Sequence, residues 1–439
     1  MAAAESGVVL ALNHDGAGLV KAGKTAFVPG TLPGETIRFR RTRRHRQHDD
    51  AELVDVVAPS PDRVAPPCPH FGVCGGCALQ HIAPAAQLAA KRAELEASLG
   101  RIGRVTPARW LEPLTGPVWN YRRRARLSAR FVAKKGRSLV GFRERSAPYV
   151  AEIDSCRVLA PPFDTLVTPL AQLLTGLSIR ERVPQIEVSV GERASAVILR
   201  VLVPPTPADV EAIRAFGAAH AVTMYLQPGG LDTVAPLGGV PAALDYSLPQ
   251  FDLRLAFEPV DFIQVNADVN RALVSQAVRW LDAGPADRVL DLYCGLGNFT
   301  LALARGGAEV VGVEGDPGLI ARARGNAVRN GIANAAFHVG NLAAEDSGQE
   351  RWWAGGFTHV LLDPPRAGAR EVLAPVAKLA PKRIVYVSCH PGTLARDLGI
   401  LVHEHGYGLV AAGVLDMFPH TTHVESMAVL EPIHDTSRP

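Results

Sequence analysis

Cys389 is the residue of this 439-residue chain whose surroundings best suit covalent chemistry. It lies in Ser388-Cys-His-Pro391, after an apolar segment expected to be a strand and before a helix expected to begin near Gly392. The amino terminus of a helix lowers the pKa of a thiol, and the thiolate is the nucleophilic form. A cysteine that only packs in a core is the alternative, and the loop position counts against it. We therefore expect Cys389 to attack a substrate.

Three other cysteines are clustered, and a fourth lies far downstream. Cys68, Cys74 and Cys77 form Cys-x5-Cys-Gly-Gly-Cys, and Cys156 is the remote member. Four thiolates can bind zinc or hold an iron–sulfur cluster, and the cysteine pattern does not separate the two. In a reducing compartment metal ligation is favoured over disulfides. Cys294 has no such company and is expected to pack.

A glycine-rich loop indicates a cofactor site. Asp291-Leu-Tyr-Cys-Gly-Leu-Gly-Asn298 lies where one strand is expected to end and a helix to begin, and its glycines allow close approach of a ligand. Glu314 ends the next expected strand, where a carboxylate can accept hydrogen bonds from both hydroxyls of a ribose. Nicotinamide enzymes share these features. Thr300 in place of their third glycine, and the acidic residue that opens the loop, favour a methyl donor instead.

Two further carboxylates follow or begin expected strands. Asp363 opens Asp363-Pro-Pro-Arg366, where two prolines stiffen the loop and direct the carboxylate toward the cleft. Glu425, in His423-Val-Glu-Ser426, is the best candidate for a base that removes a proton after Cys389 has reacted. The alternatives are a plain proline-rich turn and a solvated acid at a strand edge.

Basic residues are bunched, although the net charge is only +3. One run contains Arg38, Arg40, Arg41, Arg43, Arg44 and Arg46, and the other contains Arg122, Arg123, Arg124, Arg126 and Arg130. Either run alone is equally well explained as solvated surface, but two runs favour a polyanionic partner. A hydrophobic content of 47% with 20% charged residues is typical of a folded soluble protein. The chain has no membrane-length apolar run and no secretory signal, so we expect a cytoplasmic protein with no membrane partner.

The elements that must position these residues fall into three parts. Residues 1–60 alternate short apolar stretches with turns, which predicts a small β-barrel. A proline-rich linker, the cysteine cluster and a helix from Pro84 to Leu99 follow, and then a mixed α/β region. From about residue 268 strands and helices alternate, which predicts a doubly wound, mostly parallel sheet with its ligands at the carboxyl ends of the strands.

Together these motifs resemble the bacterial RNA uracil-C5 methyltransferases over essentially the whole chain. Phe27 to Glu35 is similar to the RNA-binding TRAM barrel of that family, and the four clustered cysteines match its [4Fe-4S] ligands. The resemblance implies that six residues surround S-adenosylmethionine: Gln264, Tyr293, Asn298, Glu314, Asn341 and Asp363. It also implies that Cys389 adds to C6 of a uracil and that Glu425 accepts the C5 proton. Tyr293 stands where relatives often carry Phe, and Gln264 would have been overlooked without the resemblance.

The presence of both barrel and cluster favours the branch of the family that modifies 23S ribosomal RNA. Its implied organisation is a TRAM-like barrel at 1–60, a central cluster-bearing domain at 61–262 and a catalytic methyltransferase domain at 263–439. We allow for part of 90–125 packing on the catalytic domain. A monomer is expected. The alternatives are the same chemistry on another ribosomal or transfer RNA uracil, an inactive cluster-bearing RNA-binding protein, and a nicotinamide oxidoreductase.

Overall fold

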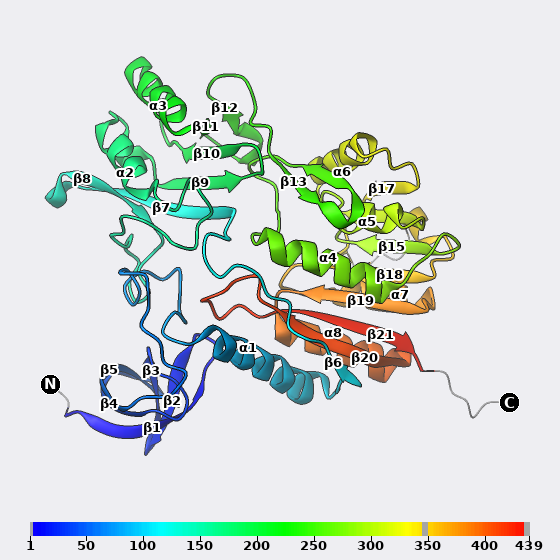
Figure 1. The fold of residues 1–439 in the computed structure, drawn as a ribbon, viewed down its shortest axis with the longest axis horizontal. Coiled ribbons are helices and arrows are strands. Elements are labelled where there is room, and N and C mark those ends of the chain that lie inside the picture. The colour runs from blue at the N-terminus through cyan, green and yellow to red at the C-terminus, as the bar shows by residue number, and fades with distance from the viewer. Residues whose placement is uncertain (1–2, 345–349, 434–439) are drawn as a thin grey trace.

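The computed structural model describes residues 3–344 and 350–433, and Figure 1 shows a small barrel, a central sheet and a larger C-terminal sheet. The barrel is closed, with strand order β1-β2-β3-β5-β4. Its strands are β1 (Glu5–Leu12), β2 (Ala17–Ala22), β3 (Lys24–Pro29), β4 (Thr36–Arg44) and β5 (Asp49–Ala58). In β4, Ile37 and Phe39 are buried while Arg38 faces solvent, as the two-residue period of a strand requires. The predicted barrel is confirmed, with β2 as a strand that the sequence pattern did not suggest.

Helix α1 (Pro84–Ser98) runs from the barrel toward the C-terminal sheet (Figure 1). Pro84 suits the first helical turn because a backbone N–H has no partner there. A π-helical turn (Leu99–Gly103) continues it against α8 (Pro391–His405). The two segments approach closely, and the approach requires glycine at 399, because a Cβ there would lie 2.9 Å from the carbonyl oxygen of Gly103. Next, β6 (Arg109–Trp110) pairs in parallel with β20 (Tyr407–Leu415), so this part of the chain belongs to the C-terminal sheet.

The central sheet has six strands in the order β12-β11-β10-β9-β7-β8. They are β7 (Arg124–Val132), β8 (Arg137–Gly141), β9 (Gln185–Val190), β10 (Ser195–Arg200), β11 (Thr223–Gln227) and β12 (Ala235–Pro236). Two helices accompany the sheet, α2 (Val167–Gly176) and α3 (Pro207–His220). Helix α3 begins where it does because Thr206 and Asp209 form a reciprocal capping box. A hairpin of β13 (Asp245–Leu248) and β14 (Leu253–Ala256) leads from this sheet to the C-terminal sheet.

The C-terminal sheet has eight strands in the order β17-β16-β15-β18-β19-β21-β20-β6. Besides β6 and β20 they are β15 (Arg288–Leu292), β16 (Glu309–Glu314), β17 (Ala335–Val339), β18 (His359–Leu362), β19 (Arg383–Ser388) and β21 (Glu425–Pro432). Pairing is parallel from β17 through β19, and β21 is antiparallel to both of its neighbours. The central strands read as continuous apolar runs because helices cover both faces. The predicted doubly wound sheet is confirmed.

Two apolar layers flank this sheet. On one face α4 (Ala267–Leu281), α5 (Thr300–Arg305) and α6 (Pro317–Arg329) contribute to one buried cluster. On the other, α1, α7 (Arg370–Lys378) and α8 contribute to a second cluster. Strands β15, β16, β18 and β19 therefore end at one edge of the sheet, where the parallel fold gathers functional side chains.

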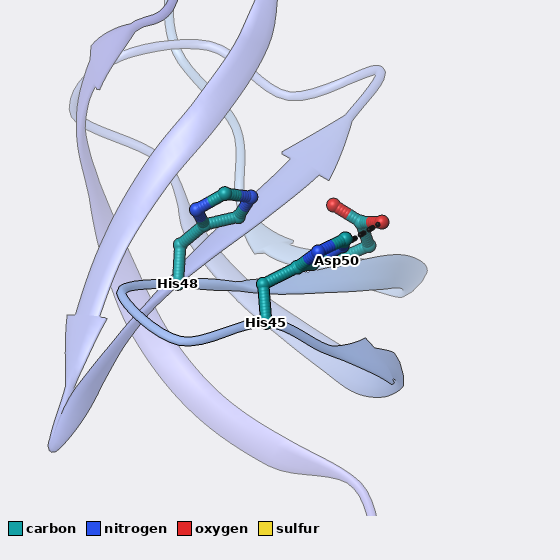
Figure 2. A group of neighbouring side chains, drawn as sticks. All are labelled: His45, His48 and Asp50. Carbon is teal, nitrogen blue, oxygen red and sulfur yellow. Dashed lines mark hydrogen bonds and ion pairs between the residues drawn. The ribbon is translucent and has the colours of Figure 1, made fainter.

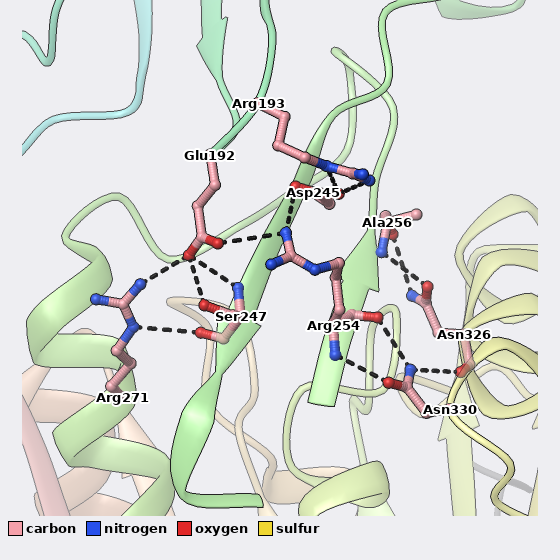
Figure 3. A network of polar contacts seen from close by, with 9 residues as sticks. All are labelled: Glu192, Arg193, Asp245, Ser247, Arg254, Ala256, Arg271, Asn326 and Asn330. Carbon is pink, nitrogen blue, oxygen red and sulfur yellow. Dashed lines mark hydrogen bonds and ion pairs between the residues drawn. The ribbon is translucent and has the colours of Figure 1, made fainter. Parts of the chain in front are cut away.

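A polar network joins the central sheet, the hairpin and the C-terminal helices (Figure 3). The Glu192 carboxylate, between β9 and β10, accepts hydrogen bonds from Ser247 and from Arg271 of α4. On the other side, the Asn326 and Asn330 side chains of α6 donate to and accept from the backbone of β14. The hairpin is thus bonded to both neighbouring parts, which fixes the central sheet against the cofactor-loop side of the molecule.

Candidate active site

Strand register places Cys389 beside Glu425. The antiparallel ladder between β19 and β21 pairs Ser388 with Ser426, so the residue that follows β19 and the residue that begins β21 are neighbours at the functional edge. Cys389 is half-buried in the turn before α8. His390 caps that helix, since its Nδ1 accepts a hydrogen bond from the Thr393 amide at 3.2 Å. The two residues proposed for covalent chemistry and proton removal are therefore brought together by the sheet.

The electrostatics at Cys389 differ from the sequence expectation. Burial, followed by the charges of Glu425 and Asp363, raises the pKa of the Cys389 thiol to about 11, with Arg366 opposing the shift. The expected lowering of the thiol pKa by the helix terminus is wrong, because a partly buried thiol next to two carboxylates is costly to ionise. The thiol is consequently protonated at neutral pH and must lose its proton when a substrate arrives.

Glu425 has the environment of a proton acceptor. Its side chain is only 7% exposed, and burial together with the charge of Asp363 raises its pKa to about 8. Arg366 and Lys91 oppose this rise. A base whose pKa lies near the working pH combines a useful ionised fraction with real basicity. The alternative of a solvated strand-edge acid is excluded by this burial.

Two more carboxyl groups at this edge have pKa values raised to near neutral pH. Burial raises the pKa of Asp291 to about 7, and burial with the charge of Glu314 raises that of Asp363 to about 7. Thr300, which replaces the third glycine of a dinucleotide loop, donates its hydroxyl to Asp291 Oδ2. Asp291 Oδ1 has no hydrogen-bond partner among the described residues. Thr300 therefore anchors the acidic residue that opens the cofactor loop.

The glycine loop and Glu314 form one hydrogen-bonded unit. Gly295 and Gly297 have φ of +54° and +95°, a region that favours glycine. Glu314 accepts from the amide of Gly295 at 3.2 Å and from the amide of Gly315 at 2.7 Å. This fixes a carboxylate at the carboxyl end of β16, beside the loop. Cys294 is 3% exposed within the core, in agreement with a packing role.

The remaining predicted cofactor residues have varied surroundings. Asn298 exchanges hydrogen bonds with Asn270 and accepts one from the Tyr246 hydroxyl at 2.9 Å, so its amide is oriented by two residues that sequence analysis did not identify. Gln264 and Tyr293 are half-buried. Asn341 is exposed after β17 and accepts from the Ala343 amide. A hydrogen-bonding partner on another element carries no local sequence signal, which is why Asn270 and Tyr246 were missed.

The four clustered cysteines line one cavity, together with Phe142 and Ile153. Burial and the neighbouring thiols raise the pKa of Cys74 to about 11 and that of Cys77 to about 12. Among the described residues, no three of the four sulfur atoms lie all within 4.8 Å of one another. The paired glycines are needed because a Cβ on Gly76 would lie 2.9 Å from the Phe142 ring. The fold thus brings all four thiols to one place.

Five of the eleven arginines in the two runs form ion pairs with carboxylates. Arg38 pairs with Asp55 at 2.7 Å, Arg40 pairs with Glu52 at 2.7 Å, and Arg126 pairs with Glu187 at 3.0 Å. Arg41 and Arg124 also have carboxylate partners. Three arginines of the first run, Arg43, Arg44 and Arg46, are exposed and form no ion pair within residues 3–344 and 350–433. In this first run, strand pairing sets acids of β5 against most of the other arginines, so the charge left for a polyanionic partner is concentrated in these three.

Comparisons with known proteins show which family the chain resembles. The family described as tRNA (Uracil-5-)-methyltransferase matches residues 246–352 and 353–433. A protein of Alkalilimnicola ehrlichii, named 23S rRNA (uracil(1939)-C(5))-methyltransferase RlmD, is 52% identical over 96% of this chain and 95% of its own length. Proteins of the same name from Xanthomonas campestris and Stenotrophomonas maltophilia are 50% identical, each over 96% of this chain and 95% and 96% of their own lengths.

A solved structure extends the likeness to three dimensions. The tRNA (uracil-54, C5)-methyltransferase of Pyrococcus abyssi, in complex with S-adenosyl-L-homocysteine, superposes with a TM-score of 0.75 at 26% identity, over 97% of this chain and 99% of that one. No described helix is long and apolar enough to cross a bilayer. Because half of the residues are shared with relatives along nearly the whole of both sequences, the chain belongs to the RNA (uracil-C5)-methyltransferase family and is an S-adenosylmethionine-dependent enzyme.

Proposed function

We propose that this enzyme methylates C5 of a specific uracil in 23S ribosomal RNA, with Cys389 as nucleophile and Glu425 as proton acceptor. The observation that carries the proposal is the register pairing of Ser388 with Ser426, which sets a cysteine next to a buried carboxylate. The relatives named for uracil 1939 of 23S RNA, at 50% to 52% identity, support the same target here. The alternative of a catalytically inactive RNA-binding protein has no support, since both residues are present and adjacent.

The reaction divides between the two residues. C5 of uracil is a weak nucleophile, so Cys389 Sγ first adds to C6, and the electron pair of the C5–C6 double bond moves toward C5 and O4. Bound S-adenosylmethionine would supply the methyl group, whose bond to the sulfonium sulfur would break as its bond to C5 forms, with S-adenosyl-L-homocysteine as the leaving group. The product of this step still carries the C5 proton. Glu425 removes that proton, the double bond re-forms, and Sγ leaves C6 as a thiolate.

The cofactor contacts are proposed for the loop edge of the sheet. Glu314, already oriented by the Gly295 and Gly315 amides, suits the ribose hydroxyls. Asp363 is partly buried at the end of β18, on the other side of β15. Tyr293, Asn298, Asn341 and Gln264 are the other residues proposed to contact S-adenosylmethionine. The cofactor class is supported by the solved relative, which is a complex with S-adenosyl-L-homocysteine and is 26% identical to this chain.

We further propose that Cys68, Cys74, Cys77 and Cys156 hold a [4Fe-4S] cluster rather than zinc. The proposal rests on the resemblance of the cysteine pattern to the [4Fe-4S] ligands of the family. It is supported by the shared cavity of the four cysteines, where the apolar Phe142 and Ile153 would shield a cluster from solvent.

The decisive experiment is nucleoside mapping of 23S RNA from cells with and without the gene, and with Cys389→Ala in its place. We expect one 5-methyluridine to vanish in the deletion and to return with wild-type protein but not with Cys389→Ala. A 23S map that is unchanged, with a 5-methyluridine lost from transfer RNA instead, would contradict the ribosomal target. It would favour the activity for which the Pyrococcus abyssi relative is named.

A further inference from the structure

The loop between β20 and β21, residues 416–424, ends directly at Glu425 and is unusually buried. Asp416 is 5% exposed and His420 4% exposed, although connecting segments normally lie on the surface. His420 also has a φ of +65°, which is costly for a residue other than glycine. Such a loop keeps one conformation only where contacts with neighbouring segments stabilise it. The segments that make these contacts, called anchors below, therefore determine the position of Glu425.

The first anchor is helix α1. Lys91 donates hydrogen bonds to the Asp416 carboxylate at 2.7 Å and to the Phe418 carbonyl at 3.0 Å. One turn earlier, the Gln87 amide oxygen accepts from the His420 backbone amide at 2.9 Å, and its nitrogen lies 3.2 Å from His420 Nδ1. Lys91 and Gln87 are both 2% exposed. Four residues apart, they present one helix face to the loop.

The second anchor is the cysteine segment. The backbone amides of Ala78 and Leu79, immediately after Cys77, both donate to the His420 carbonyl, at 2.8 and 3.0 Å. The Trp119 ring stacks on the His420 ring with centroids 4.0 Å apart. His420 is therefore bonded through its amide, its carbonyl and its ring to segments distant in sequence. The cysteine site and the loop that ends at Glu425 are joined by two direct hydrogen bonds.

Lys91 also supplies charge. Lys91 is a buried cation whose charge lowers the pKa of Glu425. Arg366, after the end of β18, lowers this pKa as well, whereas Asp363 raises it. Buried charges interact strongly because little water screens them. Loss of Lys91 would remove a favourable interaction with ionised Glu425 and leave Asp416 as an unpaired buried acid.

We propose that Gln87 and Lys91 are positioning residues of the reaction, and that through the loop 416–424 they and the cysteine segment fix the place of Glu425. The inference rests on the proposed role of Glu425. It also gives the metal site a role in positioning Glu425, because in a cysteine segment without its cluster the Ala78 and Leu79 amides would be less well ordered for their hydrogen bonds to the His420 carbonyl.

The test separates the hydrogen bonds that hold the loop from the charge that acts on Glu425. Lys91→Met removes hydrogen bonds and charge, and Gln87→Leu removes only hydrogen bonds. Arg92→Met is the matched control, because Arg92 is the next residue of α1 but pairs with exposed Glu96. Single-turnover reactions on target RNA would follow the methylated covalent adduct on denaturing gels across pH. Hydrogen exchange would follow peptides of residues 416–424 in protein with its cluster and in protein stripped of it.

We expect adduct breakdown at pH 7 to slow about tenfold or more in Lys91→Met, with the midpoint of its pH profile displaced upward. Gln87→Leu should slow breakdown without displacing the midpoint. Arg92→Met should match wild type. Exchange in the loop should quicken in both variants and in cluster-free protein. Wild-type breakdown rates in both Lys91→Met and Gln87→Leu, or loop exchange that ignores the cluster, would overturn the inference. If Glu425→Gln itself resolves the adduct normally, the proposed function fails instead.

An independent observation concerns the hairpin turn of the barrel. His45, His48 and Asp50 gather there with their ligand atoms all within 4.8 Å of one another (Figure 2). The His45 amide donates to the His48 carbonyl at 3.0 Å, which closes the turn, and Asp50 lies two residues further along on the same face of β5. His45 Nε2 is 2.9 Å from Asp50 Oδ2, and the two imidazole rings stack 4.6 Å apart.

The chemistry of this group suits a borderline metal ion. The neighbouring Asp49 is bound by Lys24 and Arg41, whereas the Asp50 carboxylate pairs only with His45 among the described residues. Two imidazoles and one carboxylate are a common ligand set for zinc, with a fourth position open. The exposed Arg43, Arg44 and Arg46 disfavour the cation but favour an anion, such as a phosphate oxygen, in that fourth position. We infer that His45, His48 and Asp50 bind one divalent ion of the zinc class.

Cobalt(II) is the probe, added to holoenzyme whose cysteines are occupied by the cluster. We expect one equivalent to bind with visible d–d absorption and without thiolate charge-transfer bands. His48→Asn and Asp50→Asn should lose this binding. His14→Asn should keep it, because His14 is an exposed barrel histidine with only Asp15 beside it. No binding by wild type, or binding that survives His48→Asn, would refute the site.

Discussion

Ser388 of β19 and Ser426 of β21 face each other across an antiparallel ladder, and this single pairing makes Cys389 a neighbour of Glu425. The other proposed site residues at the strand ends of this edge follow the parallel strands β15, β16, β17, β18 and β19. Glu425 instead begins a strand. Only a strand of reversed direction could bring a residue from its amino end to the same edge, and the order β19-β21-β20 provides it.

Because Cys389 and Glu425 are proposed to act at different steps, their variants should fail at different points of the reaction. Cys389→Ala should abolish methyl transfer, because without addition to C6 the C5 atom cannot attack the sulfonium methyl. Glu425→Gln should still add and methylate but stall before elimination, leaving a protein–RNA adduct that carries the methyl group. Denaturing electrophoresis with radiolabelled cofactor reads both outcomes. An adduct formed by Cys389→Ala would refute the assignment of the nucleophile.

The raised pKa of Glu425 predicts the pH dependence of product release. Only the ionised carboxylate accepts a proton, so adduct breakdown should rise about tenfold per pH unit up to about pH 8 and then level off. Rapid-quench measurement of adduct decay across pH 6 to 9 checks this. A profile that levels off near pH 5 would show that Glu425 is not the titrating base.

The same shift has a consequence for stability. The folded-state pKa of about 8 exceeds the ordinary value of 4.5, so folded protein retains a proton that the unfolded chain releases between those pH values. Proton binding by Glu425 therefore stabilises the folded protein fully below about pH 4.5, and this stabilisation is lost as the pH rises toward 8. Glutamine does not titrate, so the free energy of unfolding of Glu425→Gln should increase relative to that of wild type as the pH rises across this range. Urea denaturation at several pH values tests it, with exposed Glu112→Gln as the control that should show no trend.

The cysteine set should behave as one unit. Anaerobically purified protein should be brown and contain iron and sulfide, and Cys156→Ser should lose iron as completely as Cys74→Ser. The remote Cys156 is as much a part of the cavity as the clustered three, and a site short of one thiolate is labile. Metal analysis that finds one equivalent of zinc and no iron would contradict the cluster.

The unpaired arginines should carry the electrostatic share of RNA binding. Replacing Arg43, Arg44 and Arg46 together by Ala should raise the KM for RNA far more than it lowers kcat, and should flatten the dependence of binding on salt. A matched triple of Arg38, Arg40 and Arg126 removes the same charge from ion-paired positions and should have a smaller effect. Equal effects of the two triples would show that only net charge matters.

Sequence by itself determined the barrel, the doubly wound sheet and the residues with distinctive chemistry. Apolar alternation predicted the strands, and residue type and spacing were enough to propose Cys389, Glu314 and the four clustered cysteines as site residues, and the fold places them at strand ends or in one cavity. Residues that act through partners could not be identified in this way. Gln87 and Lys91 look like polar positions of a surface helix, yet they are 2% exposed because α1 packs against a loop more than 300 residues away. Likewise, the pKa of Cys389, the ion pairs of Arg38 and Arg40 and the meeting of His45, His48 and Asp50 depend on burial and strand register, which only the tertiary structure decides.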